Sequence, residues 1–425
     1  MIKVRAEQKA LLFWNSELSR TAYISGEELS ALRDWAGGRS GRSDDRGDRA
    51  DGHSYRSDGV NSRADGRSGG FIDRLMSLGI INDSVKEDVK EAIAASDTAI
   101  APPRSFCAPE SLHIELTSKC PVNCPQCYKE CDDTDLPSEL LFEVIRQADE
   151  MDVFQIALGG GEPLLYPQII GAIAEISRCG MGSSITTSGL RLDGAFLTEL
   201  KTAGLKHIQI SLNGSREEIH SRSRGGYEYG MAALKLLKDS NISFGVNWVA
   251  RMDNIDDFPQ LIETARSHRA SNINILRYKP SPKENYQDVR LTPEKMDSLE
   301  SFISDAKGIR VKVDSAFSNL LCHINQRVSY FSGCGAGRRF IAVDADGFYR
   351  PCSHVGMSEA SGDLRGTWYN SANLTLFRSI PDRISEPCSS CAALNACYGC
   401  RAVVLGQGEG FFGGDRTCPY ELNFI

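Results

Sequence analysis

The feature that most constrains the fold is a regular alternation of short β-type runs and helical patterns between residues 111 and 306. Six runs rich in β-branched residues are each followed by a segment with helical periodicity. Strands that alternate with helices predict an α/β domain with a parallel sheet and right-handed crossovers. Strands are expected at 113–117, 154–159, 183–187, 207–212, 244–250 and 272–278, and helices at 138–151, 167–178, 194–203, 227–239, 256–268 and 293–306.

This pattern leaves two architectures open, an open doubly wound sheet and a partial barrel. In both, the carboxyl ends of the strands meet at one edge, so functional side chains are expected in the loops that follow the strands. A chain of 425 residues is long enough for two or three domains. The net charge of −8 argues against nonspecific nucleic-acid binding. No apolar run is long enough to span a membrane, and the first residues lack a secretory signal, so we expect a cytoplasmic protein.

Cysteine usage is the second constraint. The chain has 14 cysteines, and in a reducing compartment clustered cysteines indicate metal ligands before they indicate disulfides. Eleven of them fall into two groups, at 120–127 and at 322–418. The other three, which fit no spacing pattern, are Cys107, Cys131 and Cys179.

The first group has the spacing C-x3-C-x2-C, at Cys120, Cys124 and Cys127, directly after the first expected strand. Three thiolates on one tight loop can hold three irons of a [4Fe–4S] cluster and leave the fourth iron open. A zinc site is the alternative, with Cys131 as a candidate fourth ligand.

In this motif the chain resembles the radical S-adenosylmethionine (SAM) superfamily. The resemblance implies a partial (β/α)6 TIM-like barrel over residues 108–308. It also implies that the amino and carboxylate groups of SAM chelate the open iron. An electron from a reductant such as flavodoxin or ferredoxin then cleaves SAM to methionine and a 5′-deoxyadenosyl radical, which abstracts a hydrogen atom from the substrate. This chain departs from the family at Gln126, where an aromatic residue often precedes the third cysteine; here the aromatic is Tyr128.

Further resemblances follow the next strands. The run GGGEP at 159–163 is similar to the family's GGEP motif, in which glycines let the backbone approach the ligand. Glu162 or the nearby backbone would accept a hydrogen bond from the SAM ammonium. The runs TTSG (186–189) and SLNG (211–214) stand where the family contacts methionine and ribose. The implied SAM contacts are Gly160, Gly161, Glu162, Pro163, Ser188, Ser211, Asn213, Arg224 for the carboxylate, and Asn247 for the ribose. Each could instead be a turn residue, or, for Arg224, a solvated surface side chain.

The second cysteine group reads Cys334-x12-Gly347-x4-Cys352, then two C-x2-C pairs, then Cys418. Two C-x2-C pairs are also typical of zinc ribbons. Behind a radical SAM core, the order resembles the SPASM extension of enzymes that modify peptides, expected here over 309–425. That family usually has three residues between the last two cysteines of the central run, whereas this chain has two. The resemblance implies two auxiliary [4Fe–4S] clusters, one on Cys322, Cys334, Cys352 and Cys400 and one on Cys388, Cys391, Cys397 and Cys418.

The first 100 residues predict a small module interrupted by an insert. Two strands within 3–25 and a helix at 26–35 precede residues 37–70, which hold seven arginines and six aspartates with almost nothing to bury. Such a composition predicts a disordered insert. An amphipathic helix running into a short strand then follows at 71–82. The unit resembles a winged-helix-like element that binds leader peptides, which could add a strand to an exposed sheet edge. A plain structural cap is the alternative.

These features favour a peptide maturase that acts on a ribosomally made precursor peptide and installs a thioether or C–C cross-link. A formylglycine-type protein-modifying enzyme is the first alternative, although that type lacks the N-terminal module. A non-catalytic iron–sulfur electron carrier is the second, but it leaves GGGEP unexplained. The substrate pocket leaves no motif in the sequence; Arg277, Tyr278, Lys279 and Asp314 lie near expected strand ends and could face the substrate.

Overall fold

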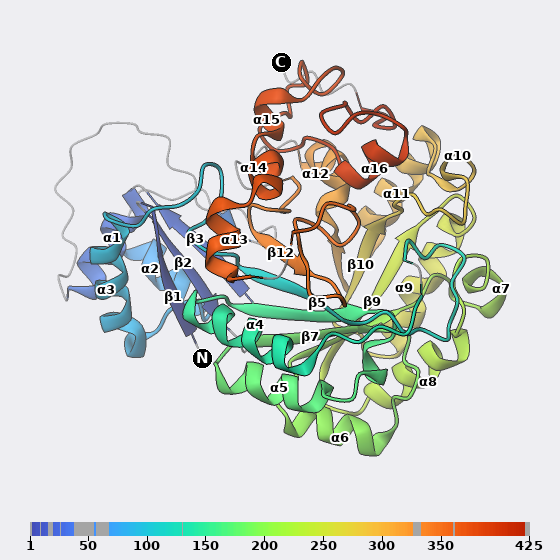
Figure 1. The fold of residues 1–425 in the computed structure, drawn as a ribbon, viewed down its shortest axis with the longest axis horizontal. Helices are drawn as coiled ribbons and strands as arrows, with labels where there is room; N and C mark the ends of the chain where they lie inside the picture. Colours follow the sequence, from blue (N-terminus) through green and yellow to red (C-terminus); the bar gives the residue numbers. More distant parts are fainter. Residues whose placement is uncertain are drawn as a thin grey trace.

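The computed structural model describes residues 2–8, 10–15, 20–25, 27–37, 55–56, 68–129, 131–325, 333–359 and 362–420. They form a four-stranded antiparallel sheet near the N-terminus and a nine-stranded, mostly parallel sheet beyond it (Figure 1). No helix among these residues is both long and apolar enough to cross a membrane.

The N-terminal sheet carries helices on one of its faces. Its strands are β1 (Ile2–Glu7), β2 (Ala10–Asn15), β3 (Arg20–Ser25) and β4 (Tyr55–Arg56), and its helices are α1 (Glu27–Ala36), α2 (Ser68–Ser77) and α3 (Lys86–Ser96). The short strand expected after α2 is not formed. Ile80 and Ile81 instead lie at a turn before α3, where both are buried in the core of this sheet and its helices. Most of the expected insert, 37–70, lies outside the described residues.

Alternating side chains of β2 explain how this sheet is attached to the rest of the chain. Leu11 and Phe13 point to the module's own helices, whereas Leu12 and Trp14 pack with Phe106 and Phe154, which lie outside this sheet. The attachment is polar as well as apolar. The guanidinium of Arg5, which is 5% exposed, ion-pairs with Glu7 and donates to the backbone oxygens of 108, 109 and 152. The sheet is therefore fixed against the amino-terminal side of the parallel sheet.

The nine-stranded sheet confirms the predicted strand–helix alternation. Its strand order is β11-β10-β9-β8-β7-β6-β5-β12-β13, and each neighbouring pair is parallel except β12 with β13. The six expected strands are β5 (Ser111–Thr117), β6 (Gln155–Gly160), β7 (Gly182–Thr187), β8 (His207–Ser211), β9 (Ser243–Ala250) and β10 (Asn272–Arg277).

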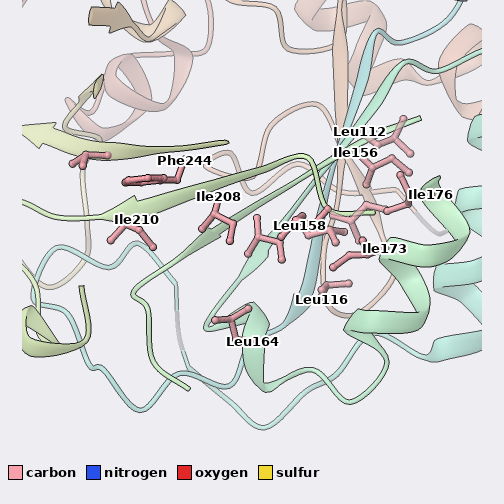
Figure 2. Close-up of a cluster of buried hydrophobic side chains, with 14 of the residues drawn as sticks. Leu112, Leu116, Ile156, Leu158, Leu164, Ile173, Ile176, Ile208, Ile210 and Phe244 are labelled. Atoms are coloured by element: carbon pink, nitrogen blue, oxygen red, sulfur yellow. The ribbon is translucent and has the colours of Figure 1, made fainter. Parts of the chain in front are cut away.

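The helices between these strands cover one face of the sheet (Figure 1). They are α4 (Ser138–Glu150), α5 (Ile169–Arg178), α6 (Gly194–Thr202), α7 (Glu217–His220), α8 (Tyr227–Leu237), α9 (Phe258–Ser267) and, after β10, α11 (Pro293–Asp305). The short helix α10 (Tyr286–Val289) packs instead with the C-terminal tail. Figure 2 shows the apolar core between sheet and helices, where Leu112 and Ile156 lie near Ile176 of α5 and Ile208 lies farther along the sheet. Because side chains alternate along a strand, the other face of the sheet carries the polar residues.

The C-terminal tail contains more regular structure than its sequence indicated. Its described residues supply three strands of the large sheet, β11 (Arg310–Val313), β12 (Phe340–Val343) and β13 (Tyr349–Arg350), and five helices, α12 (Ser318–Asn325), α13 (Leu364–Asn370), α14 (Ala372–Arg378), α15 (Ile380–Arg383) and α16 (Arg401–Gly406). β12 pairs in parallel with β5, so the tail extends the sheet beside the strand that precedes the first cysteine group. In Figure 1 the tail, orange to red, lies across the sheet from α4, α5 and α6.

Candidate functional site

The first cysteine group lies on the loop that follows β5. Cys124 is buried, while Cys120 and Cys127 are partly exposed. The loop is held from several sides: Ser281 donates to the Cys127 carbonyl (2.9 Å) and Gln126 N–H donates to the Ser223 carbonyl (3.3 Å). Burial is the main cause that raises the pKa of Cys120 to about 11, so iron would have to displace its proton.

The GGGEP run contacts this cysteine loop directly. Gly161 N–H donates to Thr117 O (2.6 Å) and Glu162 N–H donates to Lys119 O (2.8 Å). A Cβ on Gly161 would overlap the Lys119 carbonyl, and Gly160 has a φ of +119° that favours glycine. The two glycines therefore let the end of β6 lie against the segment that leads into the cysteine loop. They serve a contact within the chain, which the motif alone did not reveal.

The Glu162 carboxylate is buried and occupied by protein donors. Its Oε1 accepts from Leu164 N (3.2 Å) and Thr187 Oγ1 (2.6 Å), and its Oε2 accepts from Ser188 N (2.9 Å) and Ser188 Oγ (2.5 Å). Pro163 begins the short 3-10 helix η2 (Pro163–Leu165), which Glu162 caps. The structure thus brings Glu162 and Ser188 together, and the carboxylate fixes the ends of β6 and β7 relative to each other.

Arg224 has a buried donor, its Nε, that no group in the described part of the chain uses. Gly225, the next residue, packs against Val122 of the cysteine loop. An orphaned guanidinium beside this loop matches the charge of an anionic ligand such as a carboxylate.

Three other expected contacts lie on β8, just beyond it, and on β9. Ser211 ends β8 and is 6% exposed, and Asn213 follows it, fully buried and hydrogen-bonded to Gln126. Asn247 on β9 accepts from Asn274 Nδ2 (2.9 Å) on β10. Its neighbours Val246 and Trp248 belong to the apolar core, so Asn247 points to the opposite, polar face of the sheet.

Polar residues at the predicted substrate side form two ion pairs. Lys279 Nζ lies 3.0 Å from Asp314 Oδ2, and Lys129 pairs with Glu115. The structure thus brings together Lys279 and Asp314, two of the four residues expected near strand ends. Arg277 instead binds Asp415 (2.6 Å). Burial alone would raise the pKa of Asp415, but the charge of Arg277 and the hydrogen bonds to this carboxylate outweigh it and lower that pKa to about 2.

The tail cysteines separate into two groups around the sheet edge. Cys334, Cys352, Cys388 and Cys400 share one apolar environment. Burial, followed by the charges of Cys334 and Cys400, raises the pKa of Cys352 to about 12, whereas burial and the charges of Asp415 and Cys418 raise the pKa of Cys388. Among the described residues, no three His, Cys, Asp or Glu side chains converge on one single-ion site. A cubane cluster takes each thiolate on a different iron, so it needs thiols that are spread apart.

Cys322 departs from the predicted pairing of cysteines. It packs with Ala393 and Ala396 and against Cys391 and Cys397, which were assigned to the other cluster. The small side chains of Ala393 and Ala396, both fully buried, let α12 approach the C-x2-C run closely. Cys322 therefore lies with Cys391 and Cys397. Of the four thiols expected to hold the first auxiliary cluster, Cys334, Cys352 and Cys400 remain together.

One contact between the cysteine loops was missed by sequence reasoning. The ring of Tyr128 stacks on His354, which lies two residues after Cys352 and donates its backbone N–H to that thiol (3.5 Å). Burial and nearby lysines lower the pKa of His354 well below its usual value, so its ring is neutral. No local pattern reports a contact between residues this distant in the chain.

Two of the three unassigned cysteines lie where the N-terminal sheet meets the large sheet. Cys107 N–H donates to Glu7 (2.6 Å), and Cys179 O accepts from Lys3 (3.0 Å). Cys131 is exposed as a residue. Partial desolvation of its thiol, followed by the charge of Cys127, raises the pKa of Cys131.

Comparison with known proteins agrees with this geometry. Residues 114–265 match the model described as the Radical SAM superfamily. The chain is similar to the PqqA peptide cyclase of Gluconobacter oxydans, with 28% identity over 316 residues, which are 70% of this chain and 87% of that protein. It is 27% identical over 336 residues to the PqqA peptide cyclase of Rhizobium meliloti, 73% of this chain and 87% of that protein.

Solved structures share the fold. Streptococcus suis SuiB bound to S-adenosylmethionine superposes with a TM-score of 0.70 at 15% identity and covers 98% of both chains. SuiB bound to its precursor peptide SuiA gives 0.69. Native anSMEcpe with bound AdoMet and Cp18Cys peptide gives 0.59 at 17% identity, over 72% of this chain and 93% of that one. The similarity to SuiB includes the N-terminal sheet, because it extends over nearly the whole chain.

Proposed function

Because this chain carries a radical SAM domain over residues 114–265, we propose that it is an enzyme that modifies a ribosomally made precursor peptide. The observation that carries the proposal is the set of three thiols, Cys120, Cys124 and Cys127, on the loop after β5. Arg224, whose Nε has no hydrogen-bond partner among the described residues, comes directly before Gly225, which packs on this loop. The relatives named PqqA peptide cyclase align with most of this chain, which supports a peptide substrate.

The donor set suits a [4Fe–4S] cluster that has one open iron. Three soft thiols on one loop favour iron–sulfur over hard cations. When bound, the cluster and SAM supply a 5′-deoxyadenosyl radical that abstracts a hydrogen atom from the substrate. Arg224 would bind the SAM carboxylate, because its guanidinium has unused donors.

The remaining SAM contacts divide into two roles. Gly160, Gly161, Glu162 and Pro163 build the loop that borders the cysteines, and the Glu162 side chain holds Ser188 in place. Ser211 and Asn247 lie at or near the carboxyl ends of their strands on the polar side, where hydroxyl and amide groups suit a ribose. Glu162 therefore acts chiefly by shaping the pocket, and the backbone of this loop is left to receive the SAM ammonium.

The peptide would enter over the polar face of the sheet, beneath the C-terminal tail. This face presents neutral amides, such as the bonded pair Asn247 and Asn274, beside the Lys279–Asp314 ion pair. Amides and paired charges can bind the backbone of a peptide, and they do not require the peptide to carry a charged side chain. The reaction we propose is a thioether or C–C cross-link within the peptide.

The tail would hold two auxiliary [4Fe–4S] clusters. The first would be held by Cys334, Cys352 and Cys400, and the second by thiols drawn from Cys322, Cys388, Cys391, Cys397 and Cys418. Three thiols leave one iron of the first auxiliary cluster without a cysteine ligand. A one-electron donor of the flavodoxin or ferredoxin type would reduce the enzyme.

The N-terminal sheet and helices would bind the leader part of the precursor. SuiB, whose structure was solved with its precursor peptide, shares the fold over this segment too. Arg5 and Trp14 fix the sheet to the large domain, so a leader bound there would lie at a constant position relative to the cysteine loop. Residues 1–100 would thus recognise the substrate, 108–308 would carry the radical chemistry and 309–425 the auxiliary clusters.

The test uses the full chain, reconstituted with iron and sulfide, with SAM, a one-electron reductant and a synthetic peptide encoded by a short reading frame beside its gene. A cross-linked product has lost two hydrogens, and its fragmentation pattern is interrupted between the linked residues. A formylglycine product can show the same mass change from serine, but it reacts with a hydrazide probe. A variant that lacks all three loop cysteines is the control, and an unchanged peptide with the intact enzyme would contradict the proposal.

A further inference from the structure

A buried amide pair ties the cysteine loop to the ends of β8 and β9. Asn213, which is 0% exposed, donates from Nδ2 to Gln126 Oε1 (2.9 Å), and Gln126 stands between Cys124 and Cys127. The Gln126 backbone N–H also donates to the Ser223 carbonyl (3.3 Å). One residue of the cysteine loop is therefore anchored by both its side chain and its backbone.

Hydrogen bonds within the protein occupy both the side chain and the backbone of Asn213. The second Nδ2 proton goes to Ser223 Oγ (2.8 Å), and Oδ1 accepts from Val249 N–H (3.1 Å) on β9. The Asn213 backbone N–H donates to His220 Nδ1 (3.2 Å), and its carbonyl accepts from Asn254 (3.1 Å). Rotating the amide by half a turn would set its NH2 against the Val249 N–H, so the orientation is determined.

This arrangement changes the role expected for Asn213. Both of its side-chain protons are used within the protein, so it has no donor to offer a ligand. Gln126 occupies the position at which an aromatic residue was expected. A polar side chain there gives the cysteine loop a specific partner at the end of β8, which an aromatic ring could not provide.

We propose that Gln126 is a positioning residue whose bond to Asn213 sets the cysteine loop relative to the SAM-binding ends of β8 and β9. The reference to SAM rests on the proposed function, whereas the effect on the loop does not. Gln126 does not need to touch a ligand, because the bond acts on the backbone between two thiols. Removing its acceptor oxygen should loosen the loop and leave all three cysteines in place.

The test compares Gln126→Met, which has similar length but no acceptor, with Gln126→Glu, which keeps an acceptor oxygen. Each reconstituted protein is reduced, and SAM binding is titrated through the change that SAM causes in the electron paramagnetic resonance spectrum. Since one hydrogen bond is lost, we expect Gln126→Met to keep its iron but bind SAM about five- to tenfold more weakly. Gln126→Glu should remain within about twofold of the original protein, because its acceptor is retained.

Hydrogen exchange gives a second readout that does not depend on SAM. The segment around Cys124 to Tyr128 should exchange faster in Gln126→Met and at the original rate in Gln126→Glu. Unchanged exchange in Gln126→Met, or unchanged SAM affinity with a normal spectral response, would overturn the proposal. If the original protein shows no spectral response to SAM, the proposed function fails, and the exchange rates alone decide the role of Gln126.

Discussion

The ring of Tyr128 stacks on the imidazole of His354, with centroids 3.9 Å apart and planes inclined by 28°. Tyr128 directly follows Cys127, and His354 follows Cys352 by two residues, so this stack joins the loop of the first cysteine group to the first auxiliary group. A stacked aromatic pair contributes about 0.5–1.5 kcal/mol beyond the area that it buries. The contact therefore helps to hold the tail on the polar side of the large sheet.

Replacing Tyr128 with leucine should loosen this junction, whereas phenylalanine should preserve it. The stack is lost in Tyr128→Leu, and we expect iron to leave the reconstituted protein several-fold faster in the presence of a chelator. Trp248 and Phe258 form a comparable stack (4.2 Å) between β9 and α9, in the apolar core on the helix side of the sheet. Phe258→Leu is the matched control. Equal iron loss in Tyr128→Leu and Phe258→Leu would show that the position of the Tyr128 stack has no special importance.

Replacing Glu162 with glutamine should destabilise the protein, although the two side chains have the same shape. The carboxylate accepts four hydrogen bonds, two of them from the backbone N–H groups of Leu164 and Ser188. An amide NH2 in place of one oxygen leaves a buried N–H without an acceptor, which costs about 1–3 kcal/mol. Urea unfolding should report this loss. Glu143→Gln, on the surface beside Arg146, should cost below about 0.5 kcal/mol, and equal effects of the two changes would contradict this role.

The free energy of unfolding should fall on mild acidification because of His220. Burial lowers the pKa of His220 to about 4, and its Nδ1 accepts the Asn213 N–H. The unfolded chain, with an ordinary pKa of about 6.5, binds the proton first, so this histidine reduces stability as pH falls from about 6.5 to 4. Between pH 7 and pH 5, His220 accounts for a loss of about 2 kcal/mol in the free energy of unfolding.

The variant His220→Gln should remove that loss, so its unfolding free energy should change less between pH 7 and pH 5. Burial likewise lowers the pKa values of His113 and His207 to about 4, and these two residues maintain a residual dependence in the variant. Urea titrations at the two pH values measure the difference. An identical pH dependence in the variant and the original protein would exclude His220 as a contributor.

The location of Cys322 predicts which cluster depends on it. In a background that lacks Cys388 and Cys391, the second auxiliary cluster should be absent. Adding Cys322→Ala to that background should remove no further iron, because Cys322 packs against the same group. Adding Cys334→Ala should remove about four more irons. A loss of about four irons on adding Cys322→Ala would return Cys322 to the first auxiliary cluster.

Local periodicity was sufficient to predict the central part of the fold. Strands and helices between 111 and 306 follow the pattern of apolar residues, because alternation by two and by about 3.6 reports which face of each element is buried. Periodicity does not report pairing between distant segments. β12 joins β5 through backbone hydrogen bonds to a strand more than 200 residues earlier, and the four-residue run FIAV does not specify that partner.

The candidate site was predictable where spacing within one loop carries the signal. Cys120, Cys124 and Cys127 are such a case. The bonds that occupy Glu162 and Asn213 were not predictable, because their partners come from other strands and any Ser, Thr or Gln could serve. The grouping of Cys322 depends on how α12 packs on Ala393 and Ala396, which spacing along the chain does not encode.

The most direct test of the account is to measure 5′-deoxyadenosine. Reduced, iron-reconstituted protein incubated with SAM should release 5′-deoxyadenosine and methionine, and Cys120→Ala, Cys124→Ala and Cys127→Ala should each abolish the release. A change of Cys107, which lies at the contact with the N-terminal sheet, should leave it intact. Absence of 5′-deoxyadenosine from the fully loaded, reduced protein would contradict the radical SAM assignment and favour an iron–sulfur electron carrier.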